Sequence, residues 1–242
     1  MLDFAQFDWL SFDCYGTLID WESGILAYLK PLLRKKGCNV NDVLILNSYS
    51  EFEPLEQAGP YRGYREVLSG VVRDFARALQ FDVTPAEAAG LAESIADWEP
   101  FADTVAGLRR LQSRYKLAIL SNIDDDLFAH SARKLKVPFD LVLTAQQLRS
   151  YKPSRSNFEA LLKRLPVPRN RLLHVAESLY HDVAPAQSLG ITTVWVNRRQ
   201  GRSAAASKVS AVQPDIEVND VIHLANLAAP QDVVPGIPPP AR

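Results

Sequence analysis

Short apolar runs alternate with helical patterns over most of the chain. The runs are rich in Val, Leu, Ile, Phe and Trp and occupy residues 7–13, 116–120, 140–144, 171–175 and 192–196. Their length and composition predict buried strands. Between the later runs, apolar residues recur at the spacing of an amphipathic helix. Because strands that alternate with helices form parallel sheets, the pattern predicts an α/β fold with a Rossmann-like parallel sheet at its core.

The stretch from 22 to 98 interrupts this alternation, because it holds successive helical patterns and no strand pattern. An insertion after the first strand is expected to cover the carboxyl edge of the sheet, where open parallel sheets bind ligands. We therefore predict an α/β core domain over 1–20 and 99–230 and a helical cap domain over 21–98. Residues 198–215 are expected to form a loop and the Pro-rich segment 231–242 a flexible tail.

Four of the predicted strands end next to residues that can carry chemistry. Just past successive apolar runs stand Asp13, Ser121 with Asn122, Lys152, and residues 177–182. Taken singly, Ser121 and Asn122 could cap a helix and Lys152 could be a surface charge, but together the four groups would meet at one pocket mouth. An ionised aspartate is a nucleophile at pH 7, and a lysine beside it keeps it ionised. The set therefore favours a catalytic site around Asp13.

The same segments resemble the four motifs of the haloacid dehalogenase superfamily. They read "FDCYGTL", "LAILSNIDDD", "SYKP" and "HVAESLYHDVAPA", and their order and spacing match over about residues 7–198. The resemblance implies that Asp13 is a nucleophile that forms a covalent ester, which water then hydrolyses. It also implies that Thr17 and Ser121 hold oxyanions and that Lys152 neutralises the carboxylate.

Tyr15 decides which branch of the superfamily the first motif resembles. In the phosphatases of the superfamily, the residue two places after the nucleophile is an acid that protonates the leaving alkoxide. A phenol, with a pKa near ~10, is a poor substitute for that acid, whereas a halide leaves without a proton. The motif therefore resembles the L-2-haloacid dehalogenases, which attack the carbon beside a carboxyl group, release a 2-hydroxy acid and use no cofactor. A ring packed under the cap hinge is the structural alternative for Tyr15.

The fourth motif departs from that branch, in which this loop carries a Ser, an Asn and an Asp. "AESLYHD" instead resembles the phosphatase pattern of two acids five residues apart, Glu177 and Asp182. With Asp13 they would form an oxygen-rich Mg²⁺ site. A Mg²⁺-dependent small-molecule phosphatase is therefore the alternative function, while in the dehalogenase reading Asp182 orients the hydrolytic water and no metal is bound.

Two further residues of the dehalogenase branch are missing. The branch receives the halide on an arginine early in the cap, but the corresponding stretch "LILNSYSEFEPL" has none. Arg62 and Arg65 are the nearest substitutes, and surface exposure is the alternative for both. Phe158 stands where the dehalogenases have a tyrosine.

One relative within the branch accounts for these departures. "FDCYGTLIDWE", "LSNIDDD" and "HVAESLYHD" resemble azetidine-2-carboxylate hydrolase, which opens a strained cyclic amino acid by the same attack on carbon. The leaving amine is already an ammonium, so it needs neither an acid at Tyr15 nor an arginine. Glu177 would supply the anion for that ammonium, although a buried ion pair between Glu177 and Lys152 is another reading. The residues expected to contact substrate are Tyr15, Asn122, Glu177 and Ser178.

Composition sets the context for this chemistry. The chain has 242 residues, 47% hydrophobic and 23% charged, with a net charge of −1, which is typical of a soluble globular protein and gives no reason to expect a nucleic-acid partner. Its two cysteines favour a reducing compartment. No basic leader and no run of ~18 apolar residues is present, so we expect a cytoplasmic protein without a membrane partner.

The sequence as a whole predicts a hydrolase that acts on a small 2-substituted carboxylic acid. Trp21, Tyr61, Tyr64 and Trp98 could line an apolar pocket around that substrate, with ordinary cap packing as the alternative. A homodimer is possible by resemblance, because members of the branch often pair through the cap. A catalytically idle binding module remains the alternative from a different class, and the intact catalytic set opposes it.

Overall fold

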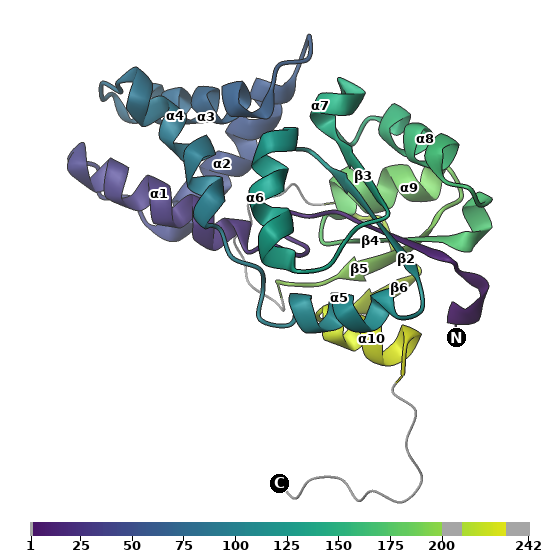
Figure 1. Ribbon diagram of the computed structural model, residues 1–242. Helices are drawn as coiled ribbons and strands as arrows, with labels where there is room; N and C mark the ends of the chain where they lie inside the picture. Colours follow the sequence, from purple (N-terminus) through teal and green to yellow (C-terminus); the bar gives the residue numbers. More distant parts are fainter. Residues whose placement is uncertain (1, 200–209, 231–242) are drawn as a thin grey trace, which may run out of the picture.

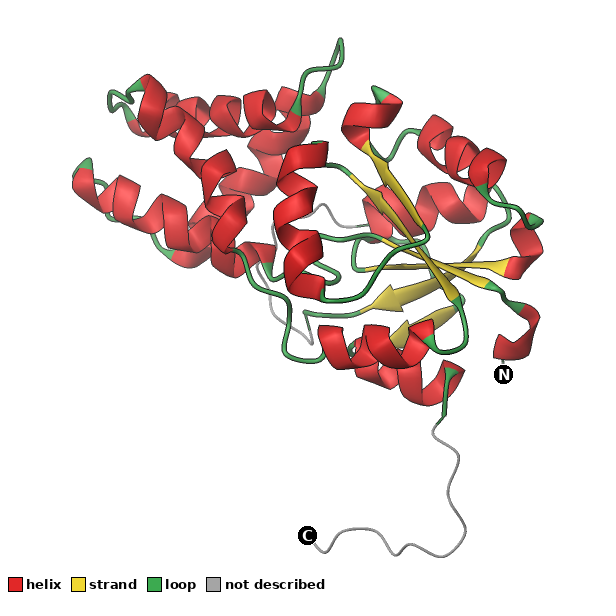
Figure 2. Cartoon of the chain, viewed as in Figure 1, coloured by secondary structure: helices red, strands yellow, loops and turns green. Residues whose placement is uncertain are grey.

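A sheet of six parallel strands lies at the centre of the described chain. The computed structural model describes residues 2–199 and 210–230. Within them the strands run in the order β3-β2-β1-β4-β5-β6 (Figures 1 and 2). Their bounds are β1 (Trp9–Phe12), β2 (Lys116–Ser121), β3 (Leu141–Thr144), β4 (Leu172–Ala176), β5 (Thr192–Val196) and β6 (Ile216–Val218).

The central position of β1 follows from its pairing. It forms parallel ladders with β2 on one side and β4 on the other. Every residue of β4, and all of β2 except Lys116, is buried. Strands covered on both faces read as continuous apolar runs, which is why the sequence pattern located them. The α/β fold with a parallel sheet is confirmed, and the five predicted strands occur with ends shifted by at most two residues.

Helices cover both faces of this sheet. Beside it lie η1 (Phe4–Gln6), α5 (Thr104–Gln112), α6 (Asp125–Leu135), α7 (Ala145–Leu148), α8 (Arg155–Arg164), η3 (Arg169–Arg171), η4 (Leu179–Val183), α9 (Ala184–Ser188) and α10 (Val221–Ala228). One hydrophobic cluster joins apolar residues of α5, α6 and α10 to the strands, and a second joins those of α8 and α9 to the opposite face. The result is a three-layer α/β/α arrangement, visible in Figure 1.

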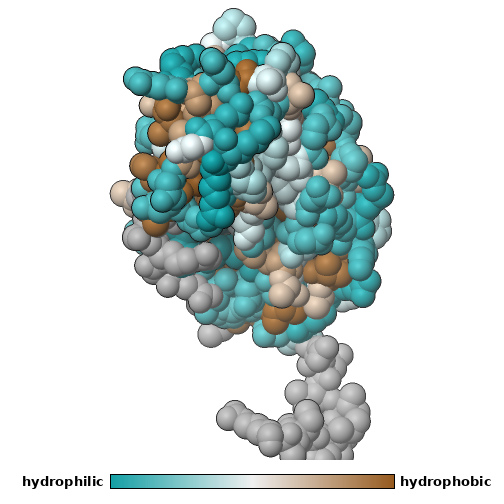
Figure 3. Space-filling view, turned by 90° about the vertical axis from the view of Figure 1, so that its left-hand side faces the viewer, coloured by the Kyte–Doolittle hydropathy of each residue, from teal (hydrophilic) through white to brown (hydrophobic). Residues whose placement is uncertain are grey.

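The segment predicted as the cap holds only helices. Its elements are α1 (Trp21–Lys35), α2 (Asp42–Gln57), α3 (Tyr64–Leu79), α4 (Pro85–Glu93) and η2 (Ser94–Asp97). In Figure 1 they gather on the left of the molecule, beside α6. Figure 3 views the molecule from that side, and hydrophilic residues with smaller hydrophobic patches among them cover the face. Because these helices follow β1 directly, they lie near the edge of the sheet where Asp13 stands.

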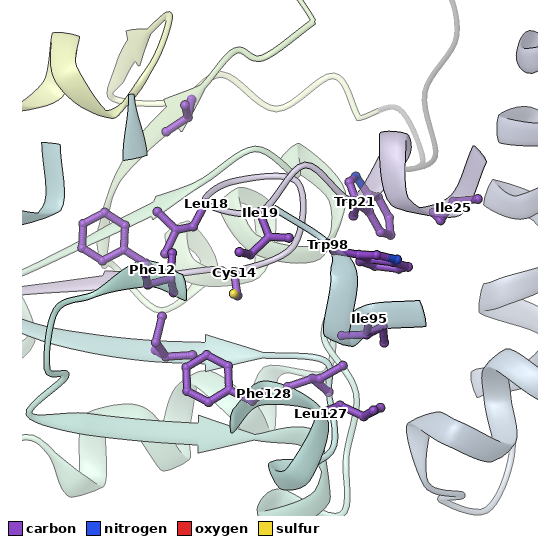
Figure 4. Close-up of a cluster of buried hydrophobic side chains, with 14 of the residues drawn as sticks. Phe12, Cys14, Leu18, Ile19, Trp21, Ile25, Ile95, Trp98, Leu127 and Phe128 are labelled. Atoms are coloured by element: carbon purple, nitrogen blue, oxygen red, sulfur yellow. The ribbon is translucent and has the colours of Figure 1, made fainter. Parts of the chain in front are cut away.

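The two chain crossings into and out of this helical segment lie side by side. Ile19 and Pro100 form an antiparallel bridge, and the backbone N–H of Asp20 donates to the carbonyl of Glu99 at 2.9 Å. Around them, buried side chains of the helical segment and of the sheet layer form one hydrophobic cluster, drawn in Figure 4. A Cβ atom at Gly24 would lie only 2.4 Å from Cδ1 of Trp98, so α1 packs directly on that ring.

Two regions differ from the sequence interpretation or fall outside the description. The expected loop over 198–215 is described only in part, and β6 follows it directly as a three-residue strand that the apolar pattern did not reveal. The expected flexible tail, 231–242, lies outside the described residues. No helix in the described ranges is long and apolar enough to cross a membrane.

Candidate active site

Asp13 stands directly after β1 with both carboxylate oxygens held. Oδ1 accepts a hydrogen bond from Nζ of Lys152 at 2.8 Å, and Oδ2 accepts one from Oγ1 of Thr17 at 2.8 Å. The turn between Asp13 and Thr17 requires Gly16, whose φ of +90° is strained for any other residue. Asp13 is only 7% exposed, so its carboxylate lies at the floor of a pocket and not on an open surface.

Lys152 is the cation at the centre of the site. Its side chain is 1% exposed, and Nζ donates to Asp13 Oδ1 at 2.8 Å, Asp182 Oδ1 at 2.6 Å and the carbonyl of Leu120 at 2.9 Å. An ammonium has three N–H donors, so all of them are used. The proposed ion pair between Lys152 and Glu177 is therefore wrong, because no donor of the lysine remains for it.

Asn122 fixes the backbone from which this lysine extends. Its Oδ1 accepts from the backbone N–H of Lys152 at 2.7 Å, and its Nδ2 donates to the carbonyl of the same residue at 3.0 Å. Both polar atoms of the amide are thus occupied by the main chain of one residue. Asn122 lines the pocket as expected for a substrate contact, but its hydrogen bonds hold Lys152 in place.

The buried charges shift one another's pKa values. Burial raises the pKa of Asp13, and the charge of Asp182 adds to this, while Lys152 and Thr17 oppose it. Burial alone would lower the pKa of Lys152, but the two carboxylates outweigh it and raise the pKa above its usual range. Burial would raise the pKa of Asp182 as well, but Lys152 and His174 bring this pKa below its ordinary value. The lysine therefore stays charged at neutral pH, which favours the ionised carboxylates around it.

His174 belongs to this network, although the sequence interpretation gave it no role. The imidazole is fully buried, with Nε2 at 3.0 Å from Oδ1 of Asp182 and Nδ1 at 2.8 Å from Oγ of Ser11. If Ser11 donates to Nδ1, Nε2 carries the proton and donates to Asp182. Phe158 packs edge-on against the imidazole with ring centroids 5.2 Å apart. In the sequence, His174 stands between apolar residues of a strand, and this position does not indicate the contact with Asp182.

Ser121 offers the pocket a hydroxyl that has no hydrogen-bond partner among the described residues. The residue is 3% exposed, and its Oγ is buried without a hydrogen-bond partner in the described part of the chain. Buried hydroxyls are almost always paired in folded proteins. Since Ser121 lines the same pocket as Asp13 and Lys152, this hydroxyl is placed to bond a ligand oxygen.

Tyr15 lines the pocket with its ring but directs its hydroxyl elsewhere. The phenol oxygen lies 2.9 Å from Oγ of Ser131 in α6, and the ring packs edge-on against Trp98 at 5.9 Å. Burial raises the pKa of Tyr15 well above 10. The hydroxyl is therefore engaged with the protein and is a still weaker acid than a free phenol. The ring therefore packs against Trp98, near the point where the helical segment joins the sheet layer, and it also forms part of the pocket wall.

The loop after β4 uses its polar groups in two ways. Oε1 of Glu177 accepts from Nε of Arg199 at 2.9 Å, and the backbone N–H of Glu177 donates to Oγ1 of Thr17 at 2.9 Å. Oγ of Ser178 accepts from the backbone N–H of His181 at 3.0 Å and so caps the turn that follows. Glu177, Ser178 and Asp182 all line the pocket. Arg199, which follows β5, was not predicted as a partner.

The three acids expected to hold Mg²⁺ do not form a ligand set. No group of three or more acidic, His or Cys side chains that could hold a metal ion occurs over residues 2–199 and 210–230. Both oxygens of Asp13 and Oδ1 of Asp182 accept hydrogen bonds, and Glu177 is paired with Arg199. Because Mg²⁺ requires several oxygens aimed at one point, this arrangement does not fit the ion.

The helical segment predicted as the cap contributes Trp21, Glu53 and Tyr64 to the same pocket. Glu53 was not predicted, because only aromatic residues and arginines of this segment were considered. Arg62 pairs with Glu56, and Arg65 pairs with Asp126 and Glu93, so neither is among the pocket residues. Tyr61 stacks on Tyr151. Trp98 packs against the ring of Tyr15 and does not line the pocket.

Comparisons with known proteins show the family to which the chain belongs. Residues 7–190 match the family described as haloacid dehalogenase-like hydrolase. An (S)-2-haloacid dehalogenase of Pseudomonas sp. (strain YL) is 27% identical over 195 residues, which cover 78% of this chain and 82% of the relative. The narrower resemblance to azetidine-2-carboxylate hydrolase stays a prediction.

Two solved structures share the fold. An L-2-haloacid dehalogenase from Xanthobacter autotrophicus with chloropropionic acid covalently bound has a TM-score of 0.76 and 22% identity, over 91% of this chain and 98% of the other. A magnesium-bound HAD-hydrolase of Bacillus subtilis has a TM-score of 0.75 and 16% identity, over 92% and 98%. At these identities each likeness shows the fold alone. The family match spans more than half of the sequence, and the chain is therefore a hydrolase of the haloacid dehalogenase-like family.

Proposed function

We propose that this hydrolase acts on a small 2-substituted carboxylic acid through attack of Asp13 on the C2 carbon. One observation carries the proposal. Asp13 is held between Lys152 and Thr17 at the pocket floor, while the hydroxyl of Tyr15, at the position of the phosphatase acid, is bonded to Ser131. A nucleophile with no general acid at the position of Tyr15 suits a leaving group that departs without being protonated by the enzyme.

The first step forms an ester. An oxygen of Asp13 bonds to C2, the bond between C2 and the leaving group breaks, and its electron pair departs with that group. The hydroxyl of Ser121 is available to bond the carboxylate of the substrate, because it has no partner among the described residues. This contact would orient C2 toward Asp13. The pocket cavity of about 40 Å³ accommodates only a small molecule in this arrangement.

The second step hydrolyses the ester. Water attacks the carboxyl carbon of Asp13, the bond from that carbon to the ester oxygen on C2 breaks, and the 2-hydroxy acid leaves with that oxygen while one proton is released. Lys152 and Thr17 already donate to the two carboxylate oxygens, so they are placed to stabilise the charge that develops there. Asp182 lines the pocket beside them and is the group we assign to orienting the water.

A single-turnover experiment in H₂¹⁸O tests this mechanism. With enzyme in excess over (S)-2-chloropropionate or azetidine-2-carboxylate, the product oxygen should come from Asp13 and remain unlabelled, and the label should appear in the peptide that contains Asp13. Asp13→Asn serves as the control, and its peptide should gain no label. Label that enters the first-turnover product directly would reject the ester mechanism.

A further inference from the structure

Glu53 is a buried carboxyl group that the cap contributes to the active-site pocket. It lies in α2, is 5% exposed, and lines the pocket together with Trp21 and Tyr64. Its Oε1 accepts a hydrogen bond from the hydroxyl of Tyr64 at 2.6 Å, and that hydroxyl lies 3.1 Å from the hydroxyl of Tyr49. The carboxyl group is thus held in place by α3 and by its own helix.

The cationic side chains around the pocket already form ion pairs with other acids. Lys152 pairs with Asp13 and Asp182. Arg199 pairs with Glu177, and Arg62 of the cap with Glu56. No salt bridge to Glu53 occurs among the residues that the structure describes. Its hydrogen-bond donors are neutral phenols, which balance less charge than a cation does.

This isolation changes the titration of Glu53. Burial raises the pKa of Glu53 to about 7, and the charge of Asp13 adds to the rise, while hydrogen bonds from Tyr64 and Tyr49 oppose it. A buried anion without a cationic partner is unfavourable. A ligand that brought a positive charge beside Glu53 would relieve this and hold the carboxylate ionised.

We propose that Glu53 selects substrates whose leaving group is a protonated nitrogen and disfavours substrates whose leaving group is a halide. The inference rests on the proposed attack of Asp13 on C2. In this part of the pocket, the described residues of the helical segment supply the carboxyl group of Glu53 and no arginine.

The charge changes at the leaving group explain the selection. When Asp13 bonds to C2 and the bond from C2 to a protonated ring nitrogen breaks, the electron pair turns the positive nitrogen into a neutral amine, which stays attached through the opened ring. When a halogen departs, a neutral atom becomes an anion. Relative to free enzyme and substrate, the transition state therefore presents residual positive charge to Glu53 in the first case and negative charge in the second. The difference is expected in kcat/KM, which compares the transition state with the free species.

Glu53→Gln tests the inference because the amide keeps the size of the side chain and an oxygen that Tyr64 can bond. We compare kcat/KM for azetidine-2-carboxylate and for (S)-2-chloropropionate in both proteins. The variant should lose about 10- to 100-fold on azetidine-2-carboxylate, the magnitude of one charge-assisted hydrogen bond, and should not lose on chloropropionate. Equal changes on both substrates, or no change on either, would overturn the role of Glu53.

Two further variants guard against a folding artefact. Glu51→Gln removes a carboxylate from an exposed position of the same helix and should leave the ratio of the two kcat/KM values unchanged. Glu53→Asp keeps the charge and should keep the preference for azetidine-2-carboxylate even if the overall rate falls. Loss of that preference in Glu53→Asp, equal to the loss in Glu53→Gln, would count against charge as the cause. Failure of the proposed function looks different, since neither substrate would then place label in Asp13 of the unmodified enzyme.

Discussion

Replacement of Lys152 by methionine would test the charge balance at the pocket floor. Lys152 is 1% exposed and separates two buried carboxylates, with Nζ at 2.8 Å from Asp13 and 2.6 Å from Asp182. Methionine preserves much of the volume and removes the charge. The two buried acids would then face each other with no cation between them.

The structure sets the expected magnitude. Removing one partner of a buried ion pair costs about 3–5 kcal/mol, because the remaining charge stays buried without compensation. Lys116→Met is the matched control, since Lys116 pairs with Asp140 at 2.8 Å but is 65% exposed. Exposed pairs contribute at most about 1 kcal/mol. The free energy of unfolding at neutral pH should therefore fall several times further in Lys152→Met than in Lys116→Met.

The dependence on pH gives a second criterion. Lys152 now opposes the rise in the pKa of Asp13 and lowers the pKa of Asp182, so its removal should raise both folded-state pKa values. A carboxyl group whose folded pKa exceeds its unfolded pKa stabilises the fold at low pH, and that contribution is lost as pH rises through the folded pKa. The free energy of unfolding that Lys152→Met loses relative to the unmodified protein should therefore be largest at neutral pH and smaller in acid.

Urea denaturation followed by circular dichroism, at about pH 7 and about pH 5, measures both quantities. The activity of Lys152→Met should also fall to background, because Asp13 loses its main cationic partner. A loss of stability no greater than that of Lys116→Met, or a deficit that widens toward acid, would refute this account of the site.

Two other outcomes follow from the geometry. Tyr15→Phe removes only the hydrogen bond to Ser131, so the free energy of unfolding should fall by about 1 kcal/mol and kcat should stay within about threefold; a loss of activity above about 100-fold would mean that the phenol takes part in the chemistry. Hydrolysis of p-nitrophenyl phosphate should stay at trace level in Mg²⁺ and in EDTA alike, because Asp13, Glu177 and Asp182 do not form a ligand set; substantial Mg²⁺-dependent turnover would favour the phosphatase alternative.

The part of the site built on strands was the part that sequence could locate. Asp13 follows β1, Ser121 ends β2, and Lys152 lies beyond β3. The carboxyl ends of parallel strands share one edge, so the convergence of these residues followed from the order of the apolar runs alone. The three-residue strand β6 escaped because so short a run differs little from a loop.

The contacts that could not be predicted from the sequence depend on how helices pack or on how the hydrogen-bond donors of one residue are divided among several acceptors. Glu53 reaches the pocket only through the way α2 packs on its neighbours, which the spacing of strands does not encode. The pairing of Glu177 with Lys152, one of two readings of Glu177, was wrong, because a sequence does not reveal how three N–H donors are divided among nearby acceptors. His174 contacts Ser11, which lies 163 residues away along the chain, and Asn122 contacts Lys152, which lies 30 residues away.

The bridge between Ile19 and Pro100 has a consequence for how substrate range can change in this architecture. Since the two ends of the helical segment already meet, its length and sequence can vary while β1 and β2 keep their places. Asp13 and Lys152 lie at the carboxyl edge of the sheet, and Glu53 lies in the helical segment. The side chains that the helical segment presents to the pocket can therefore change without any change to Asp13 or Lys152.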